Sequence, residues 1–119
     1  MIKAALAFFI LTGSTVIGAP AAAQSYPAKP VRWIVPLPPG GSTDLISRMI
    51  AQKLADAWRV QVIVDNRPGA AGTLGLAMAA KSPPDGYTIV LAQTGNVAIA
   101  PGLYSRLAYD PVKDLAPVT

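Results

Sequence analysis

Short apolar runs alternate with longer amphipathic stretches along this chain. Three runs are rich in β-branched residues and have the length of buried strands: VRWIV (31–35), VQVIVD (60–65) and YTIVLA (87–92). Between the first two, residues 42–58 place apolar side chains at three- and four-residue spacing, which predicts an amphipathic helix. Between the second and third, TLGLAMAAK (73–81) predicts a shorter helix.

The periodicity of residues 42–58 predicts which side of that helix is buried. The apolar face consists of Leu45, Ile46, Met49, Ile50, Leu54, Ala57 and Trp58. The other face consists of Asp44, Ser47, Arg48, Gln52, Lys53 and Asp56. Ser42 or Thr43 is expected to cap the helix, and Asp44 in the first turn suits the helix dipole.

The order strand–helix–strand–helix–strand predicts parallel strands joined by helical crossovers, an α/β sheet. Ligands bind such sheets at the carboxyl ends of the strands. The loops that follow the three strands, 36–43, 66–72 and 93–96, are therefore expected to line one end of the molecule. Residues 109–119 are expected to end in the start of a fourth strand.

The composition excludes several kinds of chemistry. The 119 residues include no cysteine or histidine, and all six acidic residues are aspartates. This excludes disulfides, thiol catalysis, serine–histidine dyads and most zinc sites, so we expect no metal ion and no cofactor. The ten lysines and arginines give a net charge of +4 but are scattered singly, so we expect no nucleic-acid partner.

The first 23 residues have the pattern of a secretory signal peptide. Lys3 precedes an apolar segment, Ala4–Leu11, and Ala21 and Ala23 form an A-x-A cleavage position. The apolar segment is too short to span a bilayer. We therefore expect residues 1–23 to be removed, a mature chain that begins at Gln24, and export to the periplasm.

The stretch VPLPPGGSTD (35–44) leaves the first strand and opens the first helix. It lacks the Gly-Lys-Ser/Thr of a phosphate loop and the G-x-S-x-G of a hydrolase, and Ser42 has no histidine to act as its base. Gly40 and Gly41 can turn tightly and expose amides beside a helix N-terminus, which suits a carboxylate. The alternative is that the glycines only turn the chain and Ser42 only caps the helix; the local sequence favours neither.

Other polar turns are less specific. GAAGTLG (69–75) does not have the spacing of the dinucleotide fingerprint. QTGNV (93–97) offers hydrogen-bond donors after the third strand. The alternative is that these are the ordinary polar residues of a surface loop. Asp65 is expected to pair with Arg67 or to fix its loop, which is a structural role.

Four stretches, taken in order and spacing, resemble one family: YPAKPVRWIVPLPPGGSTD, VIVDNRPGAAGTLG, SPPDGYTIVLA and LAYDPVKDLAPV. Over Tyr26–Thr119 the chain resembles the start of the extracytoplasmic solute receptors of tripartite tricarboxylate transporters, the Bug family. The resemblance implies a type II periplasmic-binding-protein fold of two α/β lobes, with residues 24–119 as part of the first lobe. It also implies a monomeric receptor without enzymatic activity, whose partners are a small carboxylate and the membrane subunits of the transporter.

In that family the loops after the first and third strands hold a ligand carboxylate through amides, hydroxyls and ordered water. Carried over by position, the ligand-binding residues are Pro39, Gly40, Gly41, Ser42, Asp44, Gln93, Thr94, Gly95 and Asn96. Asp44 has the same charge as such a ligand, so its place there requires a water or a helix-capping role. Asn96, Val97 and Ala100 differ from the Thr, the polar residue (often His) and the Asn of the family pattern, so specificity is not transferred.

These observations favour a periplasmic receptor that captures a small organic acid for a tripartite transporter. One alternative is an exported α/β hydrolase or transferase, which the missing histidine, cysteine and glutamate disfavour. Another is a truncated product that binds nothing. Because family members have a second lobe, we expect a chain ending at Thr119 to be a fragment with an unpaired sheet edge and an uncovered apolar face.

Overall fold

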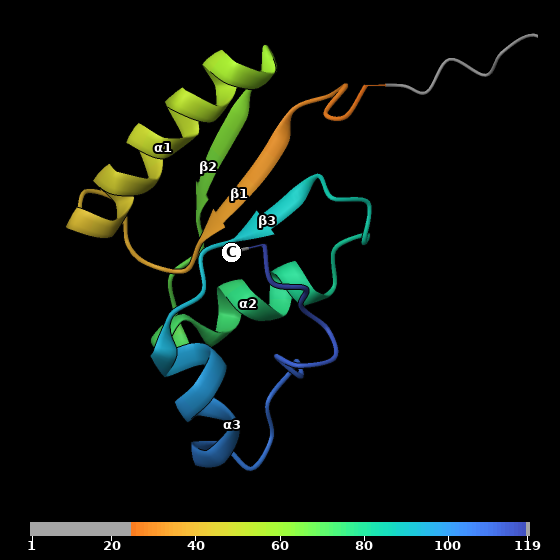
Figure 1. The fold of residues 1–119 in the computed structure, drawn as a ribbon. Coiled ribbons are helices and arrows are strands. Elements are labelled where there is room, and N and C mark those ends of the chain that lie inside the picture. Colours follow the sequence, from red (N-terminus) through yellow and green to blue (C-terminus); the bar gives the residue numbers. More distant parts are fainter. Residues whose placement is uncertain (1–24, 119) are drawn as a thin grey trace, which may run out of the picture.

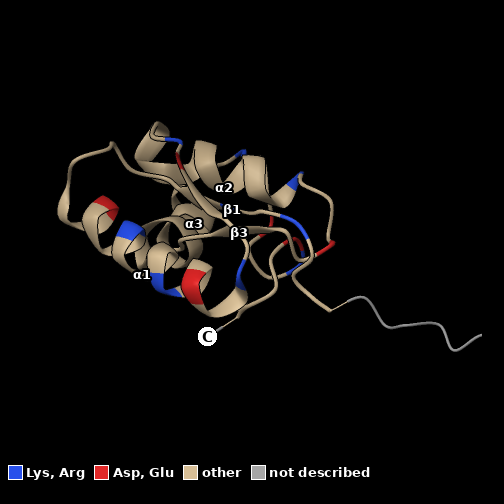
Figure 2. Cartoon of the chain, turned by 90° about the horizontal axis from the view of Figure 1, so that it is seen from above, with Lys and Arg blue, Asp and Glu red and all other residues tan. Residues whose placement is uncertain are grey.

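The computed structural model describes residues 25–118, which form a three-stranded parallel sheet with a helix on each face (Figure 1). The strand order is β2-β1-β3: β1 (Val31–Val35) lies between β2 (Val62–Asn66) and β3 (Thr88–Val90). Figure 2 shows α1 (Ser42–Trp58) and α2 (Thr73–Ala80) on opposite faces. The crossover from β1 to β2 runs toward one edge of the sheet, and the crossover from β2 to β3 runs back past β1 toward the other edge. Because both crossovers are right-handed, their helices lie on opposite faces.

The shorter elements follow the strands. A 3₁₀ turn, η1 (Ala70–Gly72), precedes α2, and a π-helical turn, η2 (Gly95–Ile99), runs into α3 (Ala100–Leu103). The predicted 31–35 strand and 42–58 helix have the observed bounds. Strand β2 begins two residues later than predicted because Val62 is the partner of Val31, where β1 begins.

The predicted fourth strand is wrong for the described residues 109–118, which form no strand. Asp110 closes a turn there instead: its side chain accepts hydrogen bonds from the amides of Val112 and Lys113, at 3.0 and 3.2 Å. The amide of Asp110 in turn donates to the side chain of Asp114 at 2.7 Å. These hydrogen bonds account for the turn at residues 110–114, and residues 115–118 after it have no regular secondary structure.

The core lies around β1 and α2. Val31, Ile34 and Val35 of β1 are wholly buried, as is Leu76 of α2. Leu76, Ala77 and Tyr109 form a cluster against which Val90, Val97, Leu107 and Leu115, among others, pack. Gly75 lets α2 approach the end of β1, since a Cβ there would lie 2.8 Å from the Cβ of Pro36.

The predicted orientation of α1 is wrong for most of the helix. The buried residues of α1 are Asp44, Ser47 and Ala51, whereas four side chains of the predicted core face are largely exposed: Leu45, Ile46, Met49 and Ile50. Leu54 and Trp58 of that face are half-buried. The small side chains of Ser47 and Ala51 allow the helix to lie close to β2. The buried carboxylate of Asp44 accepts hydrogen bonds from the Gly40 amide and from Asn66 Nδ2. Within residues 25–118 the apolar face of α1 is thus left open.

Paired substitutions on α1 test this orientation. We expect Met49→Gln to change the free energy of unfolding by less than about 0.5 kcal/mol, because Met49 is largely exposed. Ser47→Leu is expected to cost about 1–3 kcal/mol, because Ser47 has no exposed surface and a larger side chain there would overpack the contact with the sheet. Urea denaturation measures both. A greater loss in Met49→Gln than in Ser47→Leu would show that the apolar face is the buried one.

The amino ends of the strands are fastened by the segment before β1. The Tyr26 hydroxyl donates to the carbonyl of Gly86, and the amide of Ala28 donates to the Tyr87 hydroxyl at 2.9 Å. Lys29 forms an ion pair with Asp85 at 3.1 Å. The predicted signal peptide, residues 1–23, lies outside the described residues. Among residues 25–118, none of the helices has the length and apolar character needed to cross a membrane.

Candidate functional site

The three loops at the carboxyl ends of the strands meet, as predicted. Gly72 of η1 lies so close to the other two loops that a Cβ there would be 2.8 Å from Asn96 Nδ2 and 3.4 Å from the Cβ of Pro36. Gly72 also has φ +86°, a conformation that side-chain-bearing residues rarely adopt. The three loops are therefore packed together at one end of the sheet.

In the turn at Gly40 and Gly41, the amide of Gly40 donates to Asp44, whereas no hydrogen-bond acceptor within the described residues is found for the amides of Gly41 and Ser42. Gly40 has φ +86°, and Gly41 is the N-cap of α1, with its carbonyl accepting from the amide of Leu45 at 3.0 Å. The predicted capping by Ser42 or Thr43 is therefore wrong: both lie inside the helix, and their N–H groups precede the first intrahelical bond. An open hollow of about 450 Å³ is lined by residues 37–43.

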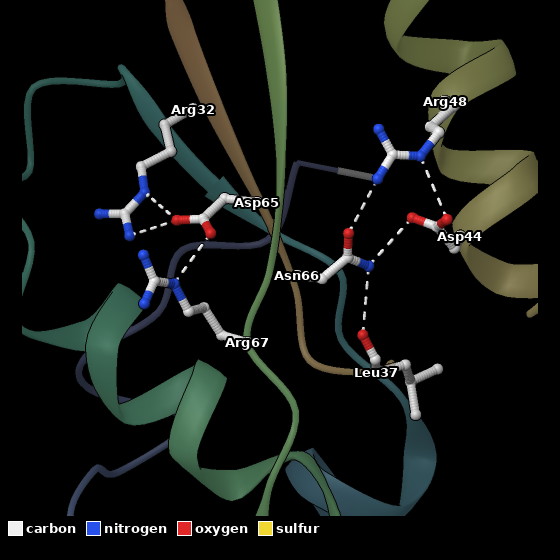
Figure 3. A network of polar contacts seen from close by, with 7 residues as sticks. All are labelled: Arg32, Leu37, Asp44, Arg48, Asp65, Asn66 and Arg67. Atoms are coloured by element: carbon white, nitrogen blue, oxygen red, sulfur yellow. Dashed lines mark hydrogen bonds and ion pairs between the residues drawn. The ribbon is translucent and has the colours of Figure 1, made fainter. Parts of the chain in front are cut away.

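Asp44 is buried, with only 5% of its surface exposed, and its hydrogen bonds are made within the protein. Oδ2 accepts from the amide of Gly40 at 2.9 Å. It also accepts from Arg48 Nε at 3.1 Å, while Oδ1 accepts from Asn66 Nδ2 at 2.9 Å (Figure 3). Asp44 is the third residue of α1, and its side chain bonds a backbone amide just before the helix, much as the third residue of a capping box does. This is the helix-capping role that was expected for a carboxylate at this position.

These hydrogen bonds keep Asp44 ionised. The amide of Gly40, then Arg48 and Asn66, lower the pKa of the Asp44 carboxyl from 3.8 to about 2. Because the pKa is lower in the folded chain, the contribution of Asp44 to stability is fully present above pH 3.8. It is lost as the pH falls from there through about 2.

A second network lies around Asp65 of β2 (Figure 3). Arg67 Nε donates to Asp65 Oδ1 at 2.8 Å, so the predicted pairing is confirmed, and Arg32 Nε donates to Oδ2 at 2.8 Å. Partial burial opposes ionisation of Asp65, but the bonds from Arg32 and Arg67 outweigh it and hold its pKa below the ordinary value. Arg32 was missed, although an arginine inside the apolar run VRWIV signals a need for an acidic partner.

The loop after β3 is organised by Asn96, which is 1% exposed. Its Oδ1 accepts from the amide of Gln93 at 2.8 Å, and the amides of Asn96 and Val97 both donate to the carbonyl of Gln93 at 3.0 Å. Buried Tyr109 donates to the Asn96 carbonyl, and burial raises the pKa of the Tyr109 hydroxyl. Among the described residues, Asn96 Nδ2 has no hydrogen-bond partner.

The predicted ligand-binding residues thus divide into two groups. The exposed ones at the carboxyl end of the sheet are Pro39, Gly40, Gly41, Ser42, Gln93, Thr94 and Gly95. The buried ones are Asp44, which accepts a hydrogen bond from Asn66 at the end of β2, and Asn96, which lies within its own loop. The prediction missed Arg48 and Asn66, because nothing in the local sequence shows that the end of β2 lies beside the first turn of α1.

The sequence profile of one family, described as the tripartite tricarboxylate transporter family receptor, matches residues 46–119. The chain belongs to this family. Among its relatives, protein BugT of Bordetella pertussis is 42% identical over 117 residues, which are 98% of this chain and 35% of BugT. Members of the family are solute-binding receptors, so the hydrolase or transferase alternative is excluded.

Solved structures of related receptors share the fold. The periplasmic binding protein BugD is 38% identical, with a TM-score of 0.70 over 75% of this chain and 29% of BugD. MatC of Rhodopseudomonas palustris, solved with bound malate, is 35% identical, with a TM-score of 0.73 over 78% of this chain and 32% of MatC. The predicted α/β first-lobe fold is confirmed. The chain spans about a third of the length of the curated relatives it matches.

Proposed function

We propose that this chain forms the carboxylate-holding wall of a periplasmic receptor that captures a small organic acid for a tripartite tricarboxylate-type transporter. The observation that carries the proposal is the Gly40–Gly41 turn, which places exposed amides at the N-terminus of the 17-residue helix α1. That position follows the central strand of a receptor-family fold whose relative MatC was solved with malate.

The chemistry of the turn suits an anion. N–H groups ahead of the first intrahelical hydrogen bond carry a partial positive charge and need acceptors. A carboxylate supplies two oxygens that each accept such bonds, and bonds to a charged acceptor are stronger than neutral ones. The negative charge of Asp44 is balanced by Arg48, with 3.1 Å between Arg48 Nε and Asp44 Oδ2, so it opposes the ligand less.

The loop after β3 supplies a second set of donors in this proposal. Gln93, Thr94 and Gly95 are exposed, and the buried Asn96 side chain fixes the turn that carries them. Val97 and Ala100 offer no polar side chain beside them. Discrimination between acids is therefore assigned to the remainder of the receptor, which in the relatives is about twice as long as the matched part.

A titration followed by amide NMR tests the proposal across a wide range of affinities. We expect malate to shift the backbone amides of Gly41 and Ser42 saturably, because these groups would donate to its carboxylates, whereas the Gly40 amide already donates to Asp44. Malamide, which matches malate in size but has no charge, is the control and is expected to leave them unchanged. Absence of a saturable shift, or equal shifts with malamide, would contradict carboxylate binding at this turn and favour a chain that binds nothing.

A further inference from the structure

Two residues outside the predicted binding set connect the Gly40–Gly41 turn to the rest of the fold (Figure 3). We propose that Asn66 and Arg48 are positioning residues: with Asp44 they hold residues 37–41 in the geometry that presents amides to a carboxylate. The inference rests on the proposed function and deepens it. It makes the end of β2 a determinant of the anion site, although β2 supplies none of the proposed ligand contacts.

Asn66 joins the two ends of the turn with one amide group. Its Nδ2 donates to the carbonyl of Leu37, where the turn begins, at 3.2 Å, and to Oδ1 of Asp44, in the first turn of α1, at 2.9 Å. The position of Asn66 is itself fixed, because it ends β2 opposite Val35 in the sheet. The next amide, that of Arg67, donates to the Val35 carbonyl at 2.8 Å. The sheet therefore determines where the turn is held.

Arg48 sets which way the Asn66 amide points. Its Nη2 donates to Asn66 Oδ1 at 2.9 Å, while its Nε donates to Asp44 Oδ2 at 3.1 Å. Because a guanidinium only donates, the oxygen of Asn66 must face it, which leaves Nδ2 directed at Asp44 and Leu37. The planar fork of an arginine spans both partners, which a lysine ammonium does not.

Packing does not hold the turn at its two glycines. A Cβ built on Gly40 or on Gly41 would have no other atom within 4 Å. The hydrogen bond from the Gly40 amide to Asp44 Oδ2, at 2.9 Å, is therefore the contact that fixes Gly40 at its positive φ. The conformation of the turn depends on the polar network and not on neighbouring side chains.

Asn66→Ala and Asp65→Asn form a matched pair of variants. Both disrupt a polar network at the end of β2, but Asp65 bonds Arg32 and Arg67 and does not contact the turn. Hydrogen exchange at the Gly40 amide, without ligand, reports on the turn; NMR titration with malate reports on affinity. We expect Asn66→Ala to speed Gly40 exchange severalfold and weaken malate binding roughly threefold to tenfold. Asp65→Asn is expected to change neither.

Arg48→Lys is a second variant that guards against misfolding, since the Arg48 side chain is half exposed. It keeps the charge beside Asp44, and we expect faster Gly40 exchange because the bridge to Asn66 is lost. Unchanged Gly40 exchange in both Asn66→Ala and Arg48→Lys, or equal effects in Asp65→Asn, would overturn the inference. If the unaltered chain binds no malate, the proposed function fails, and Gly40 exchange alone then decides whether the network holds the turn.

Discussion

Leu76→Ala is expected to lower the free energy of unfolding by about 2–5 kcal/mol, the largest loss of stability expected of the substitutions considered for this chain. Leu76 has no exposed surface and lies at the centre of the cluster with Ala77 and Tyr109. Removal of its side chain leaves a cavity beneath α2 that the sheet on one side and the C-terminal segment on the other cannot fill. Because small domains have only about 5–15 kcal/mol of stability, this loss is a large fraction of the total.

Leu74→Ala is the matched control, since it makes the same chemical change two residues earlier on the same helix. Leu74 is 52% exposed, so we expect a loss of less than about 1 kcal/mol. Urea denaturation of both variants, followed by circular dichroism, measures the difference. Equal losses of stability in the two variants would show that the Leu76 side chain does not pack in the core.

The sequence predicted the order of the elements well because strands and helices depend mainly on local patterns. The 31–35 strand and the 42–58 helix appear with the predicted bounds, and the three loops meet at one end of a parallel sheet. Apolar β-branched runs and a three-to-four-residue period are local properties, and crossover handedness then fixes the topology.

The orientation of α1 could not be predicted in the same way. Periodicity shows that a helix has an apolar face, but not what covers that face. In residues 25–118, Asp44, Ser47 and Ala51 face the sheet, while Leu45 and Met49 remain exposed. The N-cap was missed for a related reason: the side chain of Asp44 bonds the Gly40 amide, and the helix therefore begins after Gly41.

The part of the candidate site that lies within one loop was predicted from the sequence. The part that depends on contact between two elements was missed. The Gly40–Gly41 turn is visible in the sequence, and its residues are exposed as a binding turn requires. Asn66 and Arg48 lie 18 residues apart in the sequence, and only the pairing of β2 with β1 brings Asn66 beside the first turn of α1. A long-range hydrogen bond of this kind leaves no pattern in a single sequence.

The second large effect concerns one backbone amide. Ser42 is the first residue of α1, a position that tolerates proline, and Gly41 before it has φ −81° and ψ 170°, an extended conformation compatible with a following proline. Ser42→Pro therefore removes an N–H group while the helix is kept. Loss of one hydrogen bond to a charged acceptor is expected to weaken carboxylate binding roughly tenfold to hundredfold.

Ser42→Ala separates the hydroxyl from the amide, because it removes the first and keeps the second. The measurement that tests the central claim most directly is the malate affinity of Ser42→Pro relative to Ser42→Ala, by NMR titration with folding checked in the same spectra. A backbone cradle at the start of α1 predicts that Ser42→Pro binds at least about tenfold more weakly. Equal affinities in two folded variants would contradict it, and would leave the Gly40–Gly41 turn as a chain reversal only.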